Sequence, residues 1–195
     1  MKVAVDGMPA RFSSEDRRRL LQEARRAVSD ALAGRPAVPA EPEGVLGLHA
    51  GVFVSFHKHG ELRGCIGHLD ADQPLAAVVA RSAVAAATED PRFASVTRAE
   101  LDDCQIEISV LGPIEPVEDV DDIVVGRHGL IVEESWHRGL LLPQVAREQR
   151  WDRDTFLART CAKAGLPGDA WKRGATILSF EAEVFDDIDA HEGEA

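Results

Sequence analysis

The stretch "GVFVSFHKHGELRGCIG", residues 51–67, carries the pattern of two strands joined by a tight turn. The first half has apolar side chains at every second position, which is typical of a strand with one buried face. These side chains are Val52, Val54 and Phe56. Polar and glycine residues at 58–60 indicate the turn, and the apolar pattern then resumes. We therefore predict a β-hairpin with Cys65 at or just past the end of its second strand.

Periodic apolar residues predict further elements on both sides of this hairpin. Ser13 and Asp16 have the spacing of a helix-capping pair, and the helix that they open continues to Gly34. A second helix, rich in Ala and Val, is expected over residues 73–90, with Asp72 or Gln73 as its N-cap. Later helices are expected over residues 143–151, with Pro143 at the first helical position, and over residues 152–165, with Asp152 as the cap. Strands are expected over residues 104–111, 137–142 and 175–185.

The order of these elements predicts the fold class. Strands and helices do not alternate in a strict strand-helix-strand rhythm, and hairpin-like pairs dominate. We therefore expect an α+β protein with a largely antiparallel sheet. The Pro- and Gly-rich residues 34–47 predict an ordered surface connection and no domain boundary. Residues 188–195 form an acidic end that we expect to be a flexible tail.

The charge and composition of the chain disfavour several classes of function. The chain has 195 residues and a formal net charge of −12, which disfavours binding to nucleic acid or anionic lipid. No apolar run approaches the ~20 residues that a membrane span needs, and the first residues lack the pattern of a secretory signal. Three widely spaced cysteines fit a reducing compartment, so we expect a cytoplasmic protein. Nucleotide-binding and serine-hydrolase motifs are absent from the sequence.

Several motifs in a fixed order resemble the AMMECR-type domain family, whose prokaryotic members are called AmmeMemoRadiSam system protein A. The motifs are "LRGCIG" at 62–67, "AATEDPRF" at 86–93, "VGRHGL" at 125–130, "LPQVAREQRWD" at 142–152 and "KAGL" at 163–166. The resemblance implies a single AMMECR-type domain over residues 1–187. It also implies two lobes, each with a mostly antiparallel sheet flanked by helices, and a cleft between them towards which the Arg-Gly-Cys motif lies.

The resemblance further implies possible partners. Prokaryotic members of the family are encoded beside a Memo-type protein, which is similar to metal-dependent dioxygenases, and beside a radical SAM protein. It assigns no reaction and leaves the cofactor unknown. A small-molecule ligand is the class of substrate that this setting favours.

The family signature places a thiol, Cys65, between glycines and after Arg63. A thiol is a nucleophile only as thiolate, which a cation or backbone N–H groups favour, and Arg63 with Gly64 and Gly67 would supply these. The glycines would also let a substrate approach the backbone closely. The alternative is that Cys65 is a small buried residue at a crowded strand end, as free cysteines often are. The two interpretations stay open.

A cysteine enzyme needs a base, and His128 is the first candidate because Gly126 and Gly129 bracket it in a tight turn. The alternative is that its ring makes a hydrogen bond that orders the turn. His68, close to Cys65 in sequence, is the second candidate base or binding residue.

Two further side chains are candidate binding residues. Glu107, on the polar face of its strand, would orient a histidine or bind a cation, or it faces water. Arg92 is an anion ligand or the partner of Asp90, with Phe93 in the core. His57 and His59 would share one face of an extended segment, but we interpret them as a surface feature and expect no metal site.

The sequence thus supports two hypotheses of function. In the first, the protein is an enzyme that uses Cys65, Arg63 and His128 to act on or carry a small metabolite in a pathway with the Memo-type and radical SAM partners. In the second, it is a non-catalytic ligand-binding or scaffold module for those partners, and the "LRGCIG" segment serves for its shape.

Overall fold

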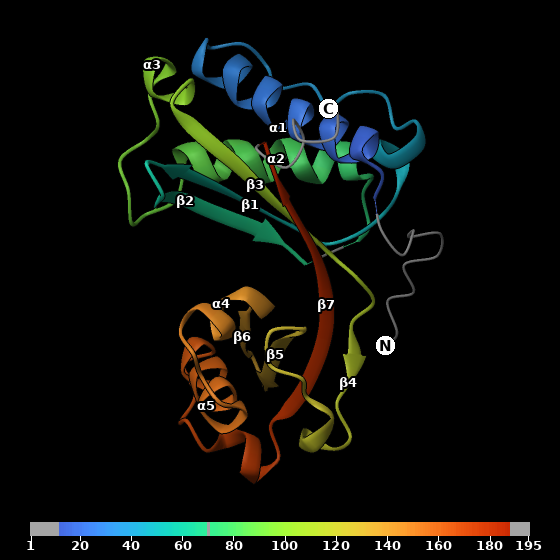
Figure 1. Ribbon diagram of the computed structural model, residues 1–195, viewed down its shortest axis with the longest axis vertical. Coiled ribbons are helices and arrows are strands. Elements are labelled where there is room, and N and C mark those ends of the chain that lie inside the picture. The colour runs from blue at the N-terminus through green and yellow to red at the C-terminus, as the bar shows by residue number, and fades with distance from the viewer. Residues whose placement is uncertain (1–11, 70, 188–195) are drawn as a thin grey trace. The chain divides into compact units, whose positions relative to one another are not determined.

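A computed structural model describes residues 12–69 and 71–187, which form two compact units (Figure 1). The first unit contains residues 12–111 and 183–187, and the second contains residues 112–182. Each has antiparallel strands and its own helices, so the predicted α+β class is confirmed. The acidic tail predicted at 188–195 lies outside the described residues, and the cleft that the resemblance implies stays a prediction.

The first unit contains a sheet with strand order β2-β1-β3, followed by the end of β7 (Thr176–Asp186). The central strand β1 pairs antiparallel with both neighbours. Figure 1 shows α1 and α2 stacked over one face of this sheet. Its elements are α1 (Ser14–Leu32), η1 (Gly44–Gly47), β1 (Val52–Lys58), β2 (Glu61–His68), α2 (Leu75–Thr88), α3 (Arg98–Leu101) and β3 (Cys104–Leu111).

Local sequence explains where the two long helices begin. Ser13 and Asp16 form the predicted capping box of α1. The prediction of Asp72 or Gln73 as the N-cap of α2 is wrong, because Pro74 occupies that position and no side chain caps the helix. The N–H of Leu75 instead donates to the carbonyl of Leu48 at 2.7 Å. A backbone contact therefore satisfies one of the donors that a cap would have served.

The hairpin predicted from residues 51–67 is present as β1 and β2, and it turns at His59 and Gly60, which both have positive φ. One face of the sheet is core, with fully buried side chains packed under α2 and α1. These are Val52, Val54, Phe56, Ile106 and Ile108. The opposite face, here called the polar face, carries Phe53, Ser55, Cys65, Gly67, Glu107 and Ser109. Cys65 lies inside β2, so the prediction that it ends the strand is wrong.

The second unit is built on β5, which pairs antiparallel with β6 and with β7, and β4 also pairs with β7. Helix α5 packs against β5 and β6. Pro143 opens α4 and Asp152 caps α5, as predicted. The elements are β4 (Glu115–Pro116), η2 (Val120–Asp122), β5 (His128–Glu134), β6 (His137–Leu141), α4 (Pro143–Glu148), α5 (Arg153–Lys163), η3 (Ala170–Arg173) and β7 (Thr176–Asp186).

None of the helices within the described residues could cross a membrane. Across residues 12–69 and 71–187, no helix has the length and apolar character that crossing a bilayer requires.

Candidate functional site

A β-bulge in the signature segment sets the position of the thiol. Leu62 pairs with His57, but the next residue of β1, Phe56, pairs with Gly64. Arg63 is therefore the extra residue of the bulge, opposed by no residue of its own on β1. A bulge on an edge strand turns its side chain away from the regular alternation, and β2 is such an edge.

The bulge decides which face of the sheet carries Cys65. In an unbroken hairpin with the same turn, Cys65 would pair with Val54 and point into the core under α2. The bulge shifts the register by one residue, so Cys65 pairs with Ser55 and lies on the polar face. The position of the thiol therefore depends on Arg63 occupying the bulge.

Three polar side chains lie in one row across the polar face. Ser55 pairs with Cys65 on one side and with Glu107 on the other, so the row crosses β2, β1 and β3 in register. Directly paired side chains of antiparallel strands lie within about 5.5 Å of one another at Cβ. Ser55 is buried, while Cys65 and Glu107 are half-buried. The row is the candidate functional site.

The environment of Cys65 favours the protonated thiol. Burial is the largest influence and raises the pKa of Cys65, and the carboxylates of Asp90 and Glu107 raise it further. A hydrogen bond with Ser55 and the charge of Arg92 act in the opposite direction without cancelling the effect. The thiol is therefore a hydrogen-bonding group at neutral pH, and a ligand would have to change its surroundings before it reacted as a thiolate.

Asp90, at the end of α2, holds the backbone of β2 at Cys65. Its Oδ2 atom accepts the Cys65 N–H at 2.9 Å and lies 2.6 Å from a guanidinium nitrogen of Arg92. Hydrogen bonding to Arg92 lowers the pKa of Asp90 far below its usual range. The guanidinium of Arg92 also lies 5.3 Å from the ring centroid of Phe93. Phe93 is half-buried, so the prediction that it belongs to the core is wrong.

Arg63 makes its charged contacts away from the thiol. Its guanidinium donates two hydrogen bonds to Glu100, at 2.8 and 3.2 Å, and one to the carbonyl of Ala94 at 2.7 Å. These bonds raise the pKa of Arg63 and lower that of Glu100. Arg63 thus connects the bulge to α3, through Glu100, and to the segment before α3, through Ala94. Arg92, rather than Arg63, is the cation that acts on Cys65.

The two glycines of the signature serve close packing within the protein. A Cβ atom on Gly64 would lie 2.1 Å from the carbonyl oxygen of Ala86 in α2. On Gly67 it would lie 2.4 Å from the ring of Phe53. Both positions exclude any larger residue without backbone movement. This packing requirement accounts for the glycines without a substrate.

One of the two candidate histidines lies on the other face of β2, and the other belongs to the second unit. His68 lies on the helix-covered face of β2, where its Nδ1 atom is 2.9 Å from the Oγ atom of Ser82 in α2. His128 belongs to the second unit, and its Nδ1 atom accepts the N–H of Val124 at 3.2 Å. That bond orders the turn, as one of the two interpretations expected. A role for either histidine as a base stays a prediction.

Sequence reasoning missed Ser55 and Asp90 as parts of the site. Ser55 is a polar residue between Val54 and Phe56 in a strand, but its register with Cys65 depends on the bulge. The sequence predicts that Asp90 pairs with Arg92, but the Asp90 carboxylate also accepts the backbone N–H of Cys65. Within residues 12–69 and 71–187, no three His, Cys, Asp or Glu side chains are grouped as a metal site would require.

Comparisons with known proteins match most of the chain to one family. The AMMECR1 family model matches residues 21–185. A protein of Methanothermobacter thermautotrophicus is 44% identical over 185 residues, which cover 90% of this chain and 96% of the relative. A protein of Thermofilum pendens is 43% identical over 194 residues, which cover 90% and 91%.

A solved structure is similar along nearly its whole length. The uncharacterized protein PH0010 from Pyrococcus horikoshii matches with a TM-score of 0.85 and 39% identity, over 90% of this chain and 93% of that one. Together with the family model and the relatives, this match covers both units described above. The chain belongs to the AMMECR1 family.

Proposed function

We propose that this AMMECR1-family protein binds a small polar metabolite in the cytoplasm, at the row formed by Cys65, Ser55 and Glu107, and acts on it or carries it. The observation that supports the proposal is the register that aligns a thiol, a hydroxyl and a carboxylate across three strands. Such a row offers a ligand both donors and acceptors on a rigid sheet. We also propose that the protein works in a pathway with Memo-type and radical SAM partners.

In the enzymatic form of the proposal, Cys65 is the reacting group. Its raised pKa means that the bound ligand or a base has to take the thiol proton before attack. Glu107 is the candidate base within the row, since Ser55 pairs with both residues, and His128 is the candidate from the second unit. Arg63 positions the thiol through the bulge, and Arg92 contributes positive charge.

A non-catalytic role is the second candidate, and specific observations favour it. The thiol is protonated at rest, Arg63 is bonded to Glu100, and Gly64 is packed against Ala86. Most of the signature therefore serves the structure of the hairpin. In this form the protein binds a ligand, or docks the same partners, without chemistry at Cys65.

Capture of metabolites from a cell extract tests the proposal. The immobilised protein is incubated with the small-molecule fraction, washed, and eluted for mass spectrometry, in parallel with Cys65→Ala and Glu107→Gln. We expect at least one compound that the unsubstituted protein retains and that each variant retains about tenfold less, since each loses a hydrogen bond to the ligand. Arg98→Ala, an exposed residue of α3, is the control and should retain the compound.

Equal capture by all four proteins, with native circular dichroism, would remove the row as the binding site. If capture fails only with Glu107→Gln, the carboxylate binds the ligand and the thiol is not required for binding. A captured compound that emerges chemically changed from the unsubstituted protein but unchanged from Cys65→Ala supports the enzymatic form over the non-catalytic one.

A further inference from the structure

A pocket of about 570 Å³ lies on the first unit, on the other side of β2 from Cys65. Helix α2, the end of β2 and the Pro-rich connection after α1 form its walls. Its volume falls in the range of ~300–1,000 Å³ that is usual for small-molecule sites. Its lining includes Ala37, Pro39, His68, Ala77, Arg81 and Glu89.

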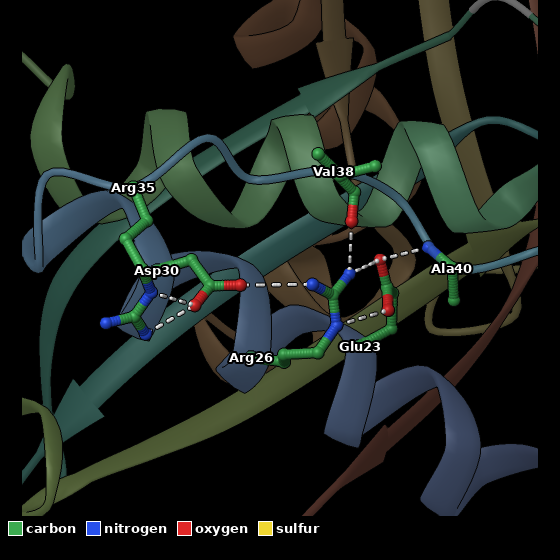
Figure 2. Close-up of polar contacts among 6 residues, drawn as sticks. All are labelled: Glu23, Arg26, Asp30, Arg35, Val38 and Ala40. Carbon is green, nitrogen blue, oxygen red and sulfur yellow. Dashed lines mark hydrogen bonds and ion pairs between the residues drawn. The ribbon is translucent and has the colours of Figure 1, made fainter.

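The connection that forms one wall is held in place by a charged network on α1. Figure 2 shows Glu23 and Arg26 reaching from α1 to this connection. Glu23 accepts the N–H of Ala40 at 3.1 Å, and Arg26 donates to the carbonyl of Val38 at 2.7 Å. The carboxylate of Glu23 is almost fully buried and lies 2.7 Å from a guanidinium nitrogen of Arg26.

Alternate residues of the connection therefore serve two purposes. The backbone groups of Val38 and Ala40 bind α1, while Ala37 and Pro39 line the pocket. Near the start of the connection, Arg35 forms an ion pair with Asp30, which also pairs with Arg26 (Figure 2). The wall is thus fixed before any ligand arrives, which lowers the entropic cost of binding.

The charges along the pocket specify the kind of ligand. Arg81 is exposed, and its only hydrogen bond among the described residues is to the neutral side chain of Gln73, at 3.3 Å. Across residues 12–69 and 71–187, no carboxylate lies within ion-pair distance of it. Glu89 lines the pocket eight residues farther along the chain, or about 12 Å along a helix axis. An acidic group would therefore lie at Arg81 and away from Glu89.

The walls between these two charges are mainly apolar. Val84 and Ala85 of α2 line the pocket between them, Ala77 lines it one turn before Arg81, and Pro39 lines it from the connection. Beneath them, His68 and the buried Ser82 satisfy each other by a hydrogen bond. The ligand body that such walls accept is apolar, because they offer few polar atoms for it to bond.

We propose that this pocket binds a free small molecule with an apolar body and one acidic group, the acid paired with Arg81 and the body lying between α2 and the connection. The site is separate from the row at Cys65 and does not rest on the function proposed for that row. Residues of β2 alternate between the two, since Ile66 and His68 line the pocket while Cys65 and Gly67 lie on the polar face.

Two fluorescent probes with similar bodies test this assignment. Anilinonaphthalene sulfonate has an aromatic body and one acidic group, and N-phenylnaphthylamine has the same body without the acid. We expect saturable binding of the sulfonate with one site per chain. Arg81→Ala should weaken binding of the sulfonate about tenfold through the lost charge-assisted hydrogen bond, and leave binding of the uncharged probe within about twofold.

Matched variants separate the pocket from other surfaces. Arg98→Ala removes another exposed arginine of the same unit and should change neither affinity. Ala77, which is half-buried, lines the pocket one turn before Arg81, so the larger side chain of Ala77→Phe should weaken the binding of both probes, and Cys65→Ala should affect neither. Circular dichroism and the thermal midpoint show that each variant is folded.

The proposal is overturned by any of three results. These are binding that never saturates, equal weakening by Arg81→Ala and Arg98→Ala, and unchanged binding in folded Ala77→Phe. Should Ala77→Phe fail to fold, Val84→Glu replaces it, because a carboxylate on the pocket wall would repel the sulfonate more than the uncharged probe.

Discussion

The carboxylate of Asp90 accepts the backbone N–H of Cys65 at 2.9 Å, which joins the end of α2 to the strand that carries the thiol. The side chain of Asp90 is 2% exposed, and its charge is compensated by Arg92. The pair acts on the thiol in opposite directions, since Asp90 raises the pKa of Cys65 and Arg92 lowers it. The structure of this junction and the chemistry of the thiol are therefore coupled.

Replacing Asp90 by asparagine should lower the free energy of unfolding by about 2–3 kcal/mol at pH 7, because Arg92 and the Cys65 N–H would lose a buried carboxylate. The depressed pKa of Asp90 gives a stabilisation that is complete above the unfolded value of about 4. It is lost progressively as the pH falls below that value. Urea unfolding at pH 7 and pH 3 should therefore show a smaller difference between the two proteins at pH 3.

Asp103→Asn is the control for this experiment. Asp103 is exposed, and its contact with Lys58 is 3.9 Å long, so the loss should stay below about 0.5 kcal/mol. A loss from Asp90→Asn that is equally small, or that grows towards pH 3, would contradict the role given to this carboxylate.

Arg63→Ala should lower the free energy of unfolding by about 2 kcal/mol, since the bulge would lose its bonds to Glu100 and Ala94. Lysine at this position should restore less than half of the lost stability, because an ammonium group cannot make the bidentate contact with a carboxylate that a guanidinium makes. In a double-mutant cycle with Glu100→Gln, the coupling energy should be about 1–2 kcal/mol. Additive losses in that cycle would mean that the contact contributes nothing.

Ser55→Ala should raise the pKa of Cys65 further, because the hydroxyl is the hydrogen-bonding group that lowers it. The measurement is the pH dependence of the iodoacetamide reaction at Cys65, followed by peptide mass spectrometry. Its midpoint should lie above that of a free thiol in the unsubstituted protein and higher still in the variant. Cys104 and Cys161, which are buried, serve as slower internal controls. A midpoint that stays in place or falls would exclude Ser55 from the site.

Gly64→Ala should destabilise the protein by about 3 kcal/mol or prevent folding, because its Cβ would lie 2.1 Å from a backbone oxygen of α2. Gly168→Ala is a matched control, since the nearest atom to its Cβ is 3.4 Å away and belongs to a side chain. The thermal midpoint of the control should change by no more than a few degrees. Similar midpoints for the two variants would contradict the close approach of β2 and α2.

The hairpin, the helices and the antiparallel strands could be predicted from sequence because their signals are local. Caps, turns and alternation involve residues a few positions apart, as at Ser13 and Asp16. The bulge at Arg63 has no such signal, since its partner Glu100 lies 37 residues away. The face that carries Cys65 depends on that bulge, so the alignment with Ser55 could not be predicted from the pattern of β1 alone.

The family motif predicts that the segment around Cys65 carries the site, whereas the contacts of its residues are set by the tertiary structure. Arg63, two residues before Cys65, binds Glu100, and the arginine that acts on the thiol is Arg92, from another motif. Charges separated in sequence interact only once the loop after α2 has folded against β2.

Protection of Cys65 against alkylation tests most directly whether the row around this thiol binds a small metabolite. Native protein is treated with iodoacetamide in the presence and absence of the small-molecule fraction of a cell extract, and the modification rates of Cys65 and Cys104 are compared. If the row binds a metabolite, the extract should slow modification of Cys65 at least about fivefold, as a ligand near saturation would, and leave the rate at Cys104 unchanged. An unchanged rate at Cys65, with a concentrated extract and folded protein, would contradict binding at the row.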